Sequence, residues 1–303
     1  MSAVSVFHEG ELAVQRRAGV RGRAERTGAM IGSSIDAADR RFLSELTFVI
    51  VGGVDERGRM WATLLLGPPG FILASESHLQ LKARPHHDDP LAGMRPGAAI
   101  GLLAIDPVTR RRLRVNGQLT RSTASGFELQ PDQVYRNCPK YIQARAAPTM
   151  PAPGRQRTRS EATALSDAQQ RWIAAADTFF IVTRHPEAGA DTSHRGGMPG
   201  FLPVPDAHRL SFPDYVGNDL FNTLGNLTAM PQTGLLFCDF AHGRTLQLTG
   251  TAHVDWDPAR SQRHPGAQRV IDVKIDAVIQ TTGVFSPTPD AVTYSRSNPP
   301  TDQ

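Results

Sequence analysis

Short apolar runs, bounded by turn residues, follow one another at intervals of about 8 to 12 residues along most of the chain. They are rich in β-branched and aromatic residues, which are typical of strands. The strand candidates are residues 48–51, 100–105, 113–119, 179–182, 234–239, 246–254 and 270–278. This pattern favours an antiparallel barrel over alternating β-α-β units, so we predict a mostly β protein with short helices, of the α+β class.

Two short helical patterns interrupt the strand pattern. Residues 36–43 (DAADRRFL) and 167–173 (DAQQRWI) each start at a polar residue that can cap a helix, and each precedes a buried strand. A further helix is predicted over residues 11–17. The two halves of the chain therefore begin alike.

The two halves also share glycine motifs. Residues 67–71 (GPPGF) return as 197–201 (GMPGF), at an offset of 201 − 71 = 130, and 101–103 (GLL) return as 234–236 at an offset of 133. Such self-similarity predicts a duplicated unit, with two barrels in tandem. The alternative is a chance match, because glycine and proline recur in unrelated turns.

These features predict the domain organisation. It comprises an amino-terminal extension (1–35), a first barrel with a degenerate site (36–146), a linker rich in proline and arginine (147–160), a second barrel that carries the site (161–285) and a poorly ordered tail (286–303). The length of 303 residues agrees with about two domains.

The charge is mildly positive, with 33 Lys and Arg against 29 Asp and Glu, a net charge of +4. Only Lys82, Lys140 and Lys274 are lysines, and the guanidinium of arginine suits planar anions such as phosphate and carboxylate. An excess of this size argues against non-specific nucleic-acid binding.

The sequence offers no sign of secretion, membrane insertion or metal binding. Two cysteines, Cys138 and Cys238, provide neither a disulfide framework nor zinc-ligand spacing. We find no secretory signal pattern and no stretch of about 18 apolar residues. We therefore expect a cytoplasmic protein with no metal site. Dinucleotide, phosphate-loop and Gly-x-Ser-x-Gly motifs are also missing, which disfavours Rossmann and common hydrolase chemistry.

The second half contains a candidate anion site. Ser193, His194 and Arg195 precede Gly196 and Gly197, and together they provide hydroxyl, guanidinium and backbone donors for a phosphate. At the repeat offset of 130, the first half has Thr63-Leu64-Leu65 instead. The second copy has therefore kept the donors.

Three asparagines follow at a spacing of four. If the stretch that contains Asn218, Asn222 and Asn226 is helical, their side chains share one face. The alternative is structural: Asn218 as an N-cap, His194 as a surface imidazole, and residues 193–197 as a polar turn.

Several motifs in this order resemble one family. They are 190–201 (ADTSHRGGMPGF), 213–218 (PDYVGN), 222–227 (NTLGNL), 234–237 (GLLF) and 246–250 (LQLTG). Together they resemble the pyridoxamine-phosphate-oxidase-like family of FMN-binding split barrels, with good coverage over 162–256. Residues 7–11 (FHEGE) and 137–143 (NCPKYIQ) resemble a subgroup that is sometimes fused to a ferredoxin-reductase-like module, which is absent here.

The resemblance implies that FMN lies between two barrels. Ser193 and Arg195 would hold its phosphate, and His194 would approach the isoalloxazine or the substrate. The other residues implied in cofactor binding are Asn218, Asn222, Thr223, Asn226, Pro199, Arg111 and Lys140. Within one chain, Arg111, Arg112 or residues near Lys140 of the first barrel would close the cleft. A homodimer of whole chains, which we expect, is compatible with this.

The function implied is an FMN-dependent oxidoreductase that passes hydride or electrons from a reductant such as NAD(P)H to a small-molecule acceptor. His194 and Tyr215 are the candidate proton donors. The Arg-x-x-Leu-Leu-Lys and Ser-Arg-Lys runs of pyridoxamine-phosphate oxidases are missing, which argues against that substrate. The alternatives are a non-catalytic flavin- or haem-binding protein, a deazaflavin enzyme and an interaction scaffold.

Overall fold

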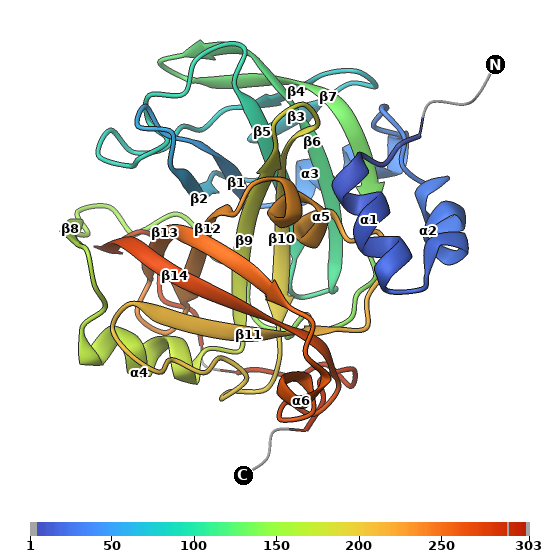
Figure 1. Cartoon of the computed structure of the whole chain (residues 1–303). Coiled ribbons are helices and arrows are strands. Elements are labelled where there is room, and N and C mark those ends of the chain that lie inside the picture. The colour runs from blue at the N-terminus through green and yellow to red at the C-terminus, as the bar shows by residue number, and fades with distance from the viewer. Residues whose placement is uncertain (1–4, 290, 301–303) are drawn as a thin grey trace.

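Two antiparallel sheets, each curled into a half-open barrel, follow one another along the chain (Figure 1). The computed structural model describes residues 5–289 and 291–300. The first sheet has the strand order β2-β1-β5-β6-β7-β4-β3. Its strands are β1 (Phe48–Val54), β2 (Met60–Leu66), β3 (Ile72–Ala74), β4 (Leu79–Leu81), β5 (Ala99–Asp106), β6 (Arg111–Thr123) and β7 (Gly126–Arg136).

The second sheet has the order β10-β9-β12-β13-β14-β11, and β8 pairs with β14. Its strands are β8 (Thr158–Ala162), β9 (Thr178–His185), β10 (Gly189–Gly196), β11 (Arg209–Tyr215), β12 (Gln232–Asp239), β13 (Arg244–Asp255) and β14 (Ala267–Thr282). All seven predicted runs lie within strands. The predicted fold class, a mostly β tandem of split barrels with short helices, is confirmed.

Short helices flank the sheets. They are α1 (Glu9–Arg17), α2 (Arg21–Gly28), α3 (Ala37–Glu45), α4 (Asp167–Ala175), α5 (Asn222–Ala229) and α6 (Pro258–Ser261). Asp36 caps α3, whereas the cap of α4 is Ser166, one residue before the predicted start. None of the described helices is long and apolar enough to cross a membrane.

Two segments differ from the predicted organisation. The end of the predicted linker is not a connection but β8, whose backbone pairs with β14 from residue 158 onward. The described part of the predicted tail (286–289 and 291–300) packs on the barrels, because Thr293 bridges to Ala144 and the amide of Ser295 donates to Gln143. Residue 290 and residues 301–303 of that tail lie outside the described residues.

The two barrels pack directly on each other, and glycines of the repeated motif allow this. A Cβ atom on Gly101 of β5 would lie 2.7 Å from the amide nitrogen of Thr192 on β10. A Cβ atom on Gly234 of β12 would lie 2.6 Å from the carbonyl oxygen of Met60 on β2. These positions admit no larger side chain, so the backbones of the two barrels touch and form a shared junction.

Candidate functional site

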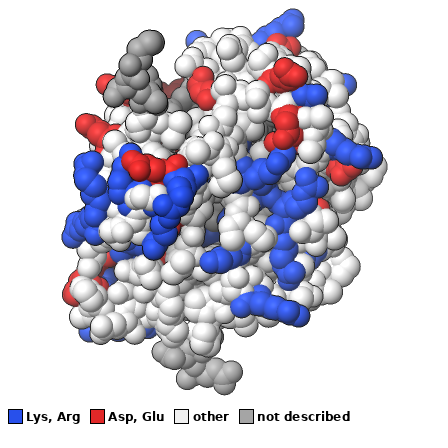
Figure 2. All heavy atoms as spheres, turned by 90° about the vertical axis from the view of Figure 1, so that its right-hand side faces the viewer, with Lys and Arg blue, Asp and Glu red and all other residues white. Residues whose placement is uncertain are grey.

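A cleft of about 280 Å³ lies at this junction. One wall comes from the first barrel, with Arg112 and Arg114 of β6 and the segment 137–141 that follows β7. The other wall comes from β10, β11 and the start of α5 in the second barrel. Figure 2 shows the face that carries α1 and α2, where Lys and Arg side chains gather on both sides of a central hollow.

Arg112 of β6 places a guanidinium in the cleft beside His194. Its Nη1 lies 3.4 Å from Nδ1 of His194, and among the described residues no carboxylate forms an ion pair with it. Burial and the charges of Arg114 and Arg195 lower the pKa of Arg112 to about 9, so the guanidinium still carries its charge at neutral pH. A half-buried cation without a carboxylate partner favours an anionic ligand.

Unsatisfied polar atoms concentrate in the same place. Nine buried side-chain nitrogen or oxygen atoms of the described residues have no hydrogen-bond partner, and five of them belong to residues that line the cleft. The five are Nε of Arg112, Nε of Arg114, Nδ2 of Asn137, Nε2 of His194 and Nε of Arg195. Since buried polar groups are normally paired, this cluster indicates a ligand with several acceptor atoms.

A buried network around Arg114 ties the two barrels together. Its Nη1 lies 3.1 Å from Oδ1 of Asp191 on β10 and donates to the hydroxyl of Tyr135 and to Oδ1 of Asn222. Burial alone would lower the pKa of Arg114, but Asp191 and Tyr135 outweigh it, so the pKa is raised. Arg114 is therefore a fixed, permanently charged part of the cleft wall.

Asp214 is shared by two guanidiniums of the second barrel. Nη1 of Arg195 lies 3.4 Å from Oδ1 of Asp214, and Nε of Arg269 lies 3.0 Å from Oδ2. The side chain of Arg195 is 24% exposed and lines the cleft. One carboxylate facing two cations leaves this end of the cleft positive.

The two predicted proton donors both line the cleft. Burial, followed by the charge of Arg112, holds the pKa of His194 well below its usual value, so its imidazole is neutral at neutral pH. Burial raises the pKa of Tyr215 to about 12, which keeps the phenol protonated.

The predicted asparagine face is only partly present. Helix α5 begins at Asn222, because Phe221 adopts a left-handed conformation (φ 61°) and breaks the helical path. Asn218 lies in the loop before it and donates to Oδ1 of Asn137. Asn222 and Asn226 share the buried side of α5, and Asn226 lies away from the cleft, where it donates to Thr183.

Of the other predicted site residues, some line the cleft and some do not. Thr223 and Lys140 line the cleft, whereas Ser193 lies behind its wall and accepts a hydrogen bond from Arg114. Arg111 and Pro199 do not line it: Arg111 lies over the ring of Phe42, and Pro199 is exposed in a turn. Successive side chains of a strand point to opposite faces, which is why Arg112 and Arg114 line the cleft and Arg111 does not.

The first-barrel positions that correspond to residues 193–195 hold no free donors among the described residues. Leu64 and Leu65 are buried in the core, and Thr63 donates to Oδ2 of Asp89 at 2.6 Å. Gln247 of the second barrel also donates to Asp89. The polar atoms at this position satisfy one another.

Four residues of the site were missed from the sequence: Arg114, Asp191, Arg269 and Glu11. Their contacts join parts of the chain that are 55 to 211 residues apart, so no local spacing reveals them. Asp191 belongs to the motif 190–201. An acidic residue in a strand of otherwise buried residues was a sequence signal that could have identified Asp191 as part of the site.

Comparisons with known proteins agree with the sequence motifs. Residues 165–295 match the family model described as pyridoxamine 5'-phosphate oxidase. A search of curated proteins finds no match.

Among solved structures, the chain is similar to a putative pyridoxamine 5'-phosphate oxidase from Lactobacillus delbrueckii, with 15% identity, coverage of 39% of this chain and 94% of that chain, and a TM-score of 0.32. It is also similar to an F420 reductase (12% identity, 37% and 95% coverage, TM-score 0.28). A third similar structure is an FMN-binding protein from Syntrophomonas wolfei (10% identity, 37% and 84% coverage, TM-score 0.29). The match of residues 165–295 to the pyridoxamine 5'-phosphate oxidase family model is to the family that the motifs predict.

Proposed function

We propose that the protein binds FMN in the cleft between its two barrels and acts as an FMN-dependent oxidoreductase. The observation that supports this most is the cluster of unpaired donors around Arg112, His194 and Arg195 in one cleft. The family resemblance implies FMN at the junction of two barrels, which is where this cleft lies.

The charges of the cleft fit a phosphate monoester. Six cationic side chains line it, against Asp214 and Asp219, which leaves a surplus of 6 − 2 = +4. Asp191, behind the wall, compensates Arg114. A phosphate monoester carries about −1.5 to −2 charges at neutral pH, so it fits within the remaining surplus.

The shape and chemistry of the other wall fit a planar ring. Tyr141 and Tyr215 line the cleft with ring centroids 5.2 Å apart, and Phe221 lies near them at the start of α5. The volume of about 280 Å³ lies just below the range of roughly 300–1,000 Å³ found for small-molecule sites. Aromatic walls with a few convergent donors are typical of such sites.

In this proposal Arg112, Arg195 and Lys140 hold the phosphate, and the aromatic wall orients the ring. Bound FMN would supply two-electron redox chemistry at its isoalloxazine. The neutral imidazole of His194 lines the cleft, and its buried Nε2 has no hydrogen-bond partner among the described residues. The protonated phenol of Tyr215 remains the candidate to donate a proton or a hydrogen bond to the substrate.

The reductant is proposed to be a nicotinamide nucleotide, and the acceptor is a small molecule of a class still to be identified. One chain provides both walls of the cleft. Closure of the site therefore does not require a homodimer, and the expected dimerisation stays a prediction.

The colour of the purified protein tests this proposal. A flavin absorption band that is bleached anaerobically by NADH or NADPH and restored by air would support the oxidoreductase. A flavin that no donor reduces would favour the non-catalytic binding protein, and a Soret band would favour haem. Protein that is colourless and rejects added FMN would contradict the proposal.

A further inference from the structure

The segment 7–11 (FHEGE) has no role in the proposed function, yet it lies against the base of the cleft. Gly10 of α1 and Gly225 of α5 face each other so closely that a Cβ atom on Gly225 would lie 2.6 Å from the amide nitrogen of Glu11. The backbones of the two helices are therefore in contact. Helix α1, from the start of the chain, has a fixed position on α5.

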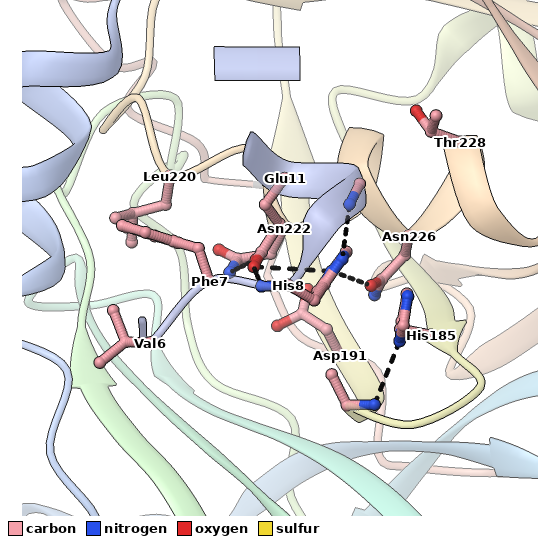
Figure 3. A network of polar contacts seen from close by, with 12 residues as sticks. Val6, Phe7, His8, Glu11, His185, Asp191, Leu220, Asn222, Asn226 and Thr228 are labelled. Atoms are coloured by element: carbon pink, nitrogen blue, oxygen red, sulfur yellow. Dashed lines mark hydrogen bonds and ion pairs between the residues drawn. The ribbon is translucent and has the colours of Figure 1, made fainter. Parts of the chain in front are cut away.

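Glu11 uses this position to reach Asn222. Glu11 is 3% exposed, and its Oε1 accepts a hydrogen bond of 2.6 Å from Nδ2 of Asn222. Oε2 accepts from the backbone amide of His8 at 3.0 Å. Figure 3 shows Glu11 and Asn222 pointing toward each other, with His8 and Asp191 beside them.

Asn222 continues this connection into the cleft. Its Oδ1 accepts a hydrogen bond of 3.2 Å from Nη1 of Arg114, and both side chains line the cleft. The amide group of Asn222 can satisfy both partners in one orientation only, with its NH₂ toward Glu11 and its oxygen toward Arg114.

We infer that α1 is a positioning element of the cleft: Glu11 holds Asn222, and through Asn222 it holds Arg114, in the orientation that binds the anion. This inference rests on the proposed function in so far as the anion is the phosphate of FMN. It assigns a role to the segment 7–11. Glu11 is a positioning residue, since it does not line the cleft.

The charges around Glu11 make this positioning sensitive to pH. Asp191, Arg114 and Tyr135 face it from β10, β6 and β7, and His8 at its own N-cap stacks on His185 of β9 with centroids 4.1 Å apart. Burial, opposed by the bonds from His8 and Asn222, raises the pKa of Glu11 to about 7.

Near neutral pH, Glu11 therefore exists in both forms. Deprotonation places a negative charge behind Arg114 and Asn222, which lowers the positive potential of the cleft. The affinity for an anion should then fall as the pH rises through about 7.

The test uses the full chain with Glu11→Ala, Glu11→Gln and the control Glu9→Ala, which removes an exposed carboxylate from the same helical turn. FMN and riboflavin, which lacks the phosphate, are titrated calorimetrically at about pH 6 and about pH 8. We expect Glu11→Ala to weaken FMN binding at least about tenfold, because Asn222 loses its acceptor. Glu9→Ala should bind as the unmodified chain does.

Glu11→Gln keeps an acceptor for Asn222 and cannot ionise, so it separates position from charge. It should match the unmodified chain at about pH 6 and bind FMN about threefold or more tightly than that chain at about pH 8. The ratio of the two affinities cancels the titration of the phosphate itself. Riboflavin affinity should show no such change in ratio.

Three results would overturn the inference: normal FMN affinity in Glu11→Ala, equal losses in Glu11→Ala and Glu9→Ala, or a ratio between Glu11→Gln and the unmodified chain that does not change with pH. Failure of the unmodified chain to bind FMN would count against the proposed function instead. In that case inorganic phosphate replaces FMN, and the increase in melting temperature that it causes should be smaller in Glu11→Ala than in Glu9→Ala. An equal increase in both would overturn the inference.

Discussion

The guanidinium of Arg112 and the imidazole of His194 approach to 3.4 Å across the junction of the two barrels. The two residues are 82 positions apart, and each contributes an unpaired buried nitrogen. A neutral imidazole beside a guanidinium without a counterion creates a local excess of donors and positive charge. Each of the following predictions depends on that arrangement or on the contacts that support it.

Arg112→Met should weaken FMN binding by about 2 kcal/mol or more, because a charge-assisted hydrogen bond to the phosphate is lost. The matched control is Arg111→Met, since Arg111 lies on the opposite face of β6 over Phe42. Isothermal titration calorimetry with FMN measures both. Equal losses in the two variants would mean that only the overall charge of β6 matters.

Arg195→Ala should weaken FMN binding by about 2 to 4 kcal/mol. Asp214 keeps its partner Arg269 in this variant, so no uncompensated carboxylate is left behind. Arg209→Ala on the same sheet, which removes an exposed guanidinium, is the control for non-specific charge loss. Unchanged affinity in Arg195→Ala would place the phosphate elsewhere.

Asp191→Asn should lower the free energy of unfolding by about 3 to 5 kcal/mol, because it leaves the charge of Arg114 buried without its counterion. Urea unfolding followed by circular dichroism measures this change. Asp206→Asn, which removes an exposed partner of Arg209, should leave the urea midpoint nearly unchanged. A similar small effect in both variants would show that solvent reaches Arg114.

Glu11→Gln should change how stability depends on pH. The folded pKa of Glu11, about 7, is above its ordinary value of 4.5, so between these values the folded state binds more protons than the unfolded state. This carboxyl group therefore lowers the stability as the pH rises from about 4.5 to 7, by about 3 kcal/mol in total. Glutamine does not ionise, so the stability of the Glu11→Gln variant does not fall for this reason as the pH rises.

Urea midpoints of both proteins from about pH 4 to about pH 8 test this prediction. The stability of Glu11→Gln relative to the unmodified chain should increase across that range and level off above neutral pH. The other titrating groups are the same in both proteins, so their contributions cancel in the difference in stability. Parallel curves would contradict the raised pKa.

Much of the fold could be predicted from the sequence because strand formation depends on local alternation and turn residues. The runs 100–105 and 246–254, for example, carry their β-branched character within a few positions. The motif 190–201 was equally informative, and residues 165–295 match the model of the family that it predicts. Helix α1 was also anticipated, and a helix was considered for the stretch that forms α5, but the contact between these two helices was not predicted.

The cleft wall was decided by tertiary structure. Arg111 and Arg112 were both considered for the site, but the register of β6 turns Arg112 and Arg114 toward β10, and Arg111 lies over Phe42. Asn218 was expected on a helix that begins only at Asn222. The first difference arises because a one-residue shift reverses the face of a strand. The second arises because two left-handed residues, Asp219 and Phe221, interrupt the helical path between Asn218 and Asn222.

The sequence by itself determined seven of the strands, the helices α1, α3 and α4, the family that the second barrel resembles and the presence of donors at positions 193–195. Only the packing of one barrel on the other decided which of those donors are free and which are already paired. Arg114 meets Asp191, and Asn222 meets Glu11, over separations of 77 and 211 residues. Contacts at such separations depend on how two sheets are oriented, which no local pattern of residues encodes.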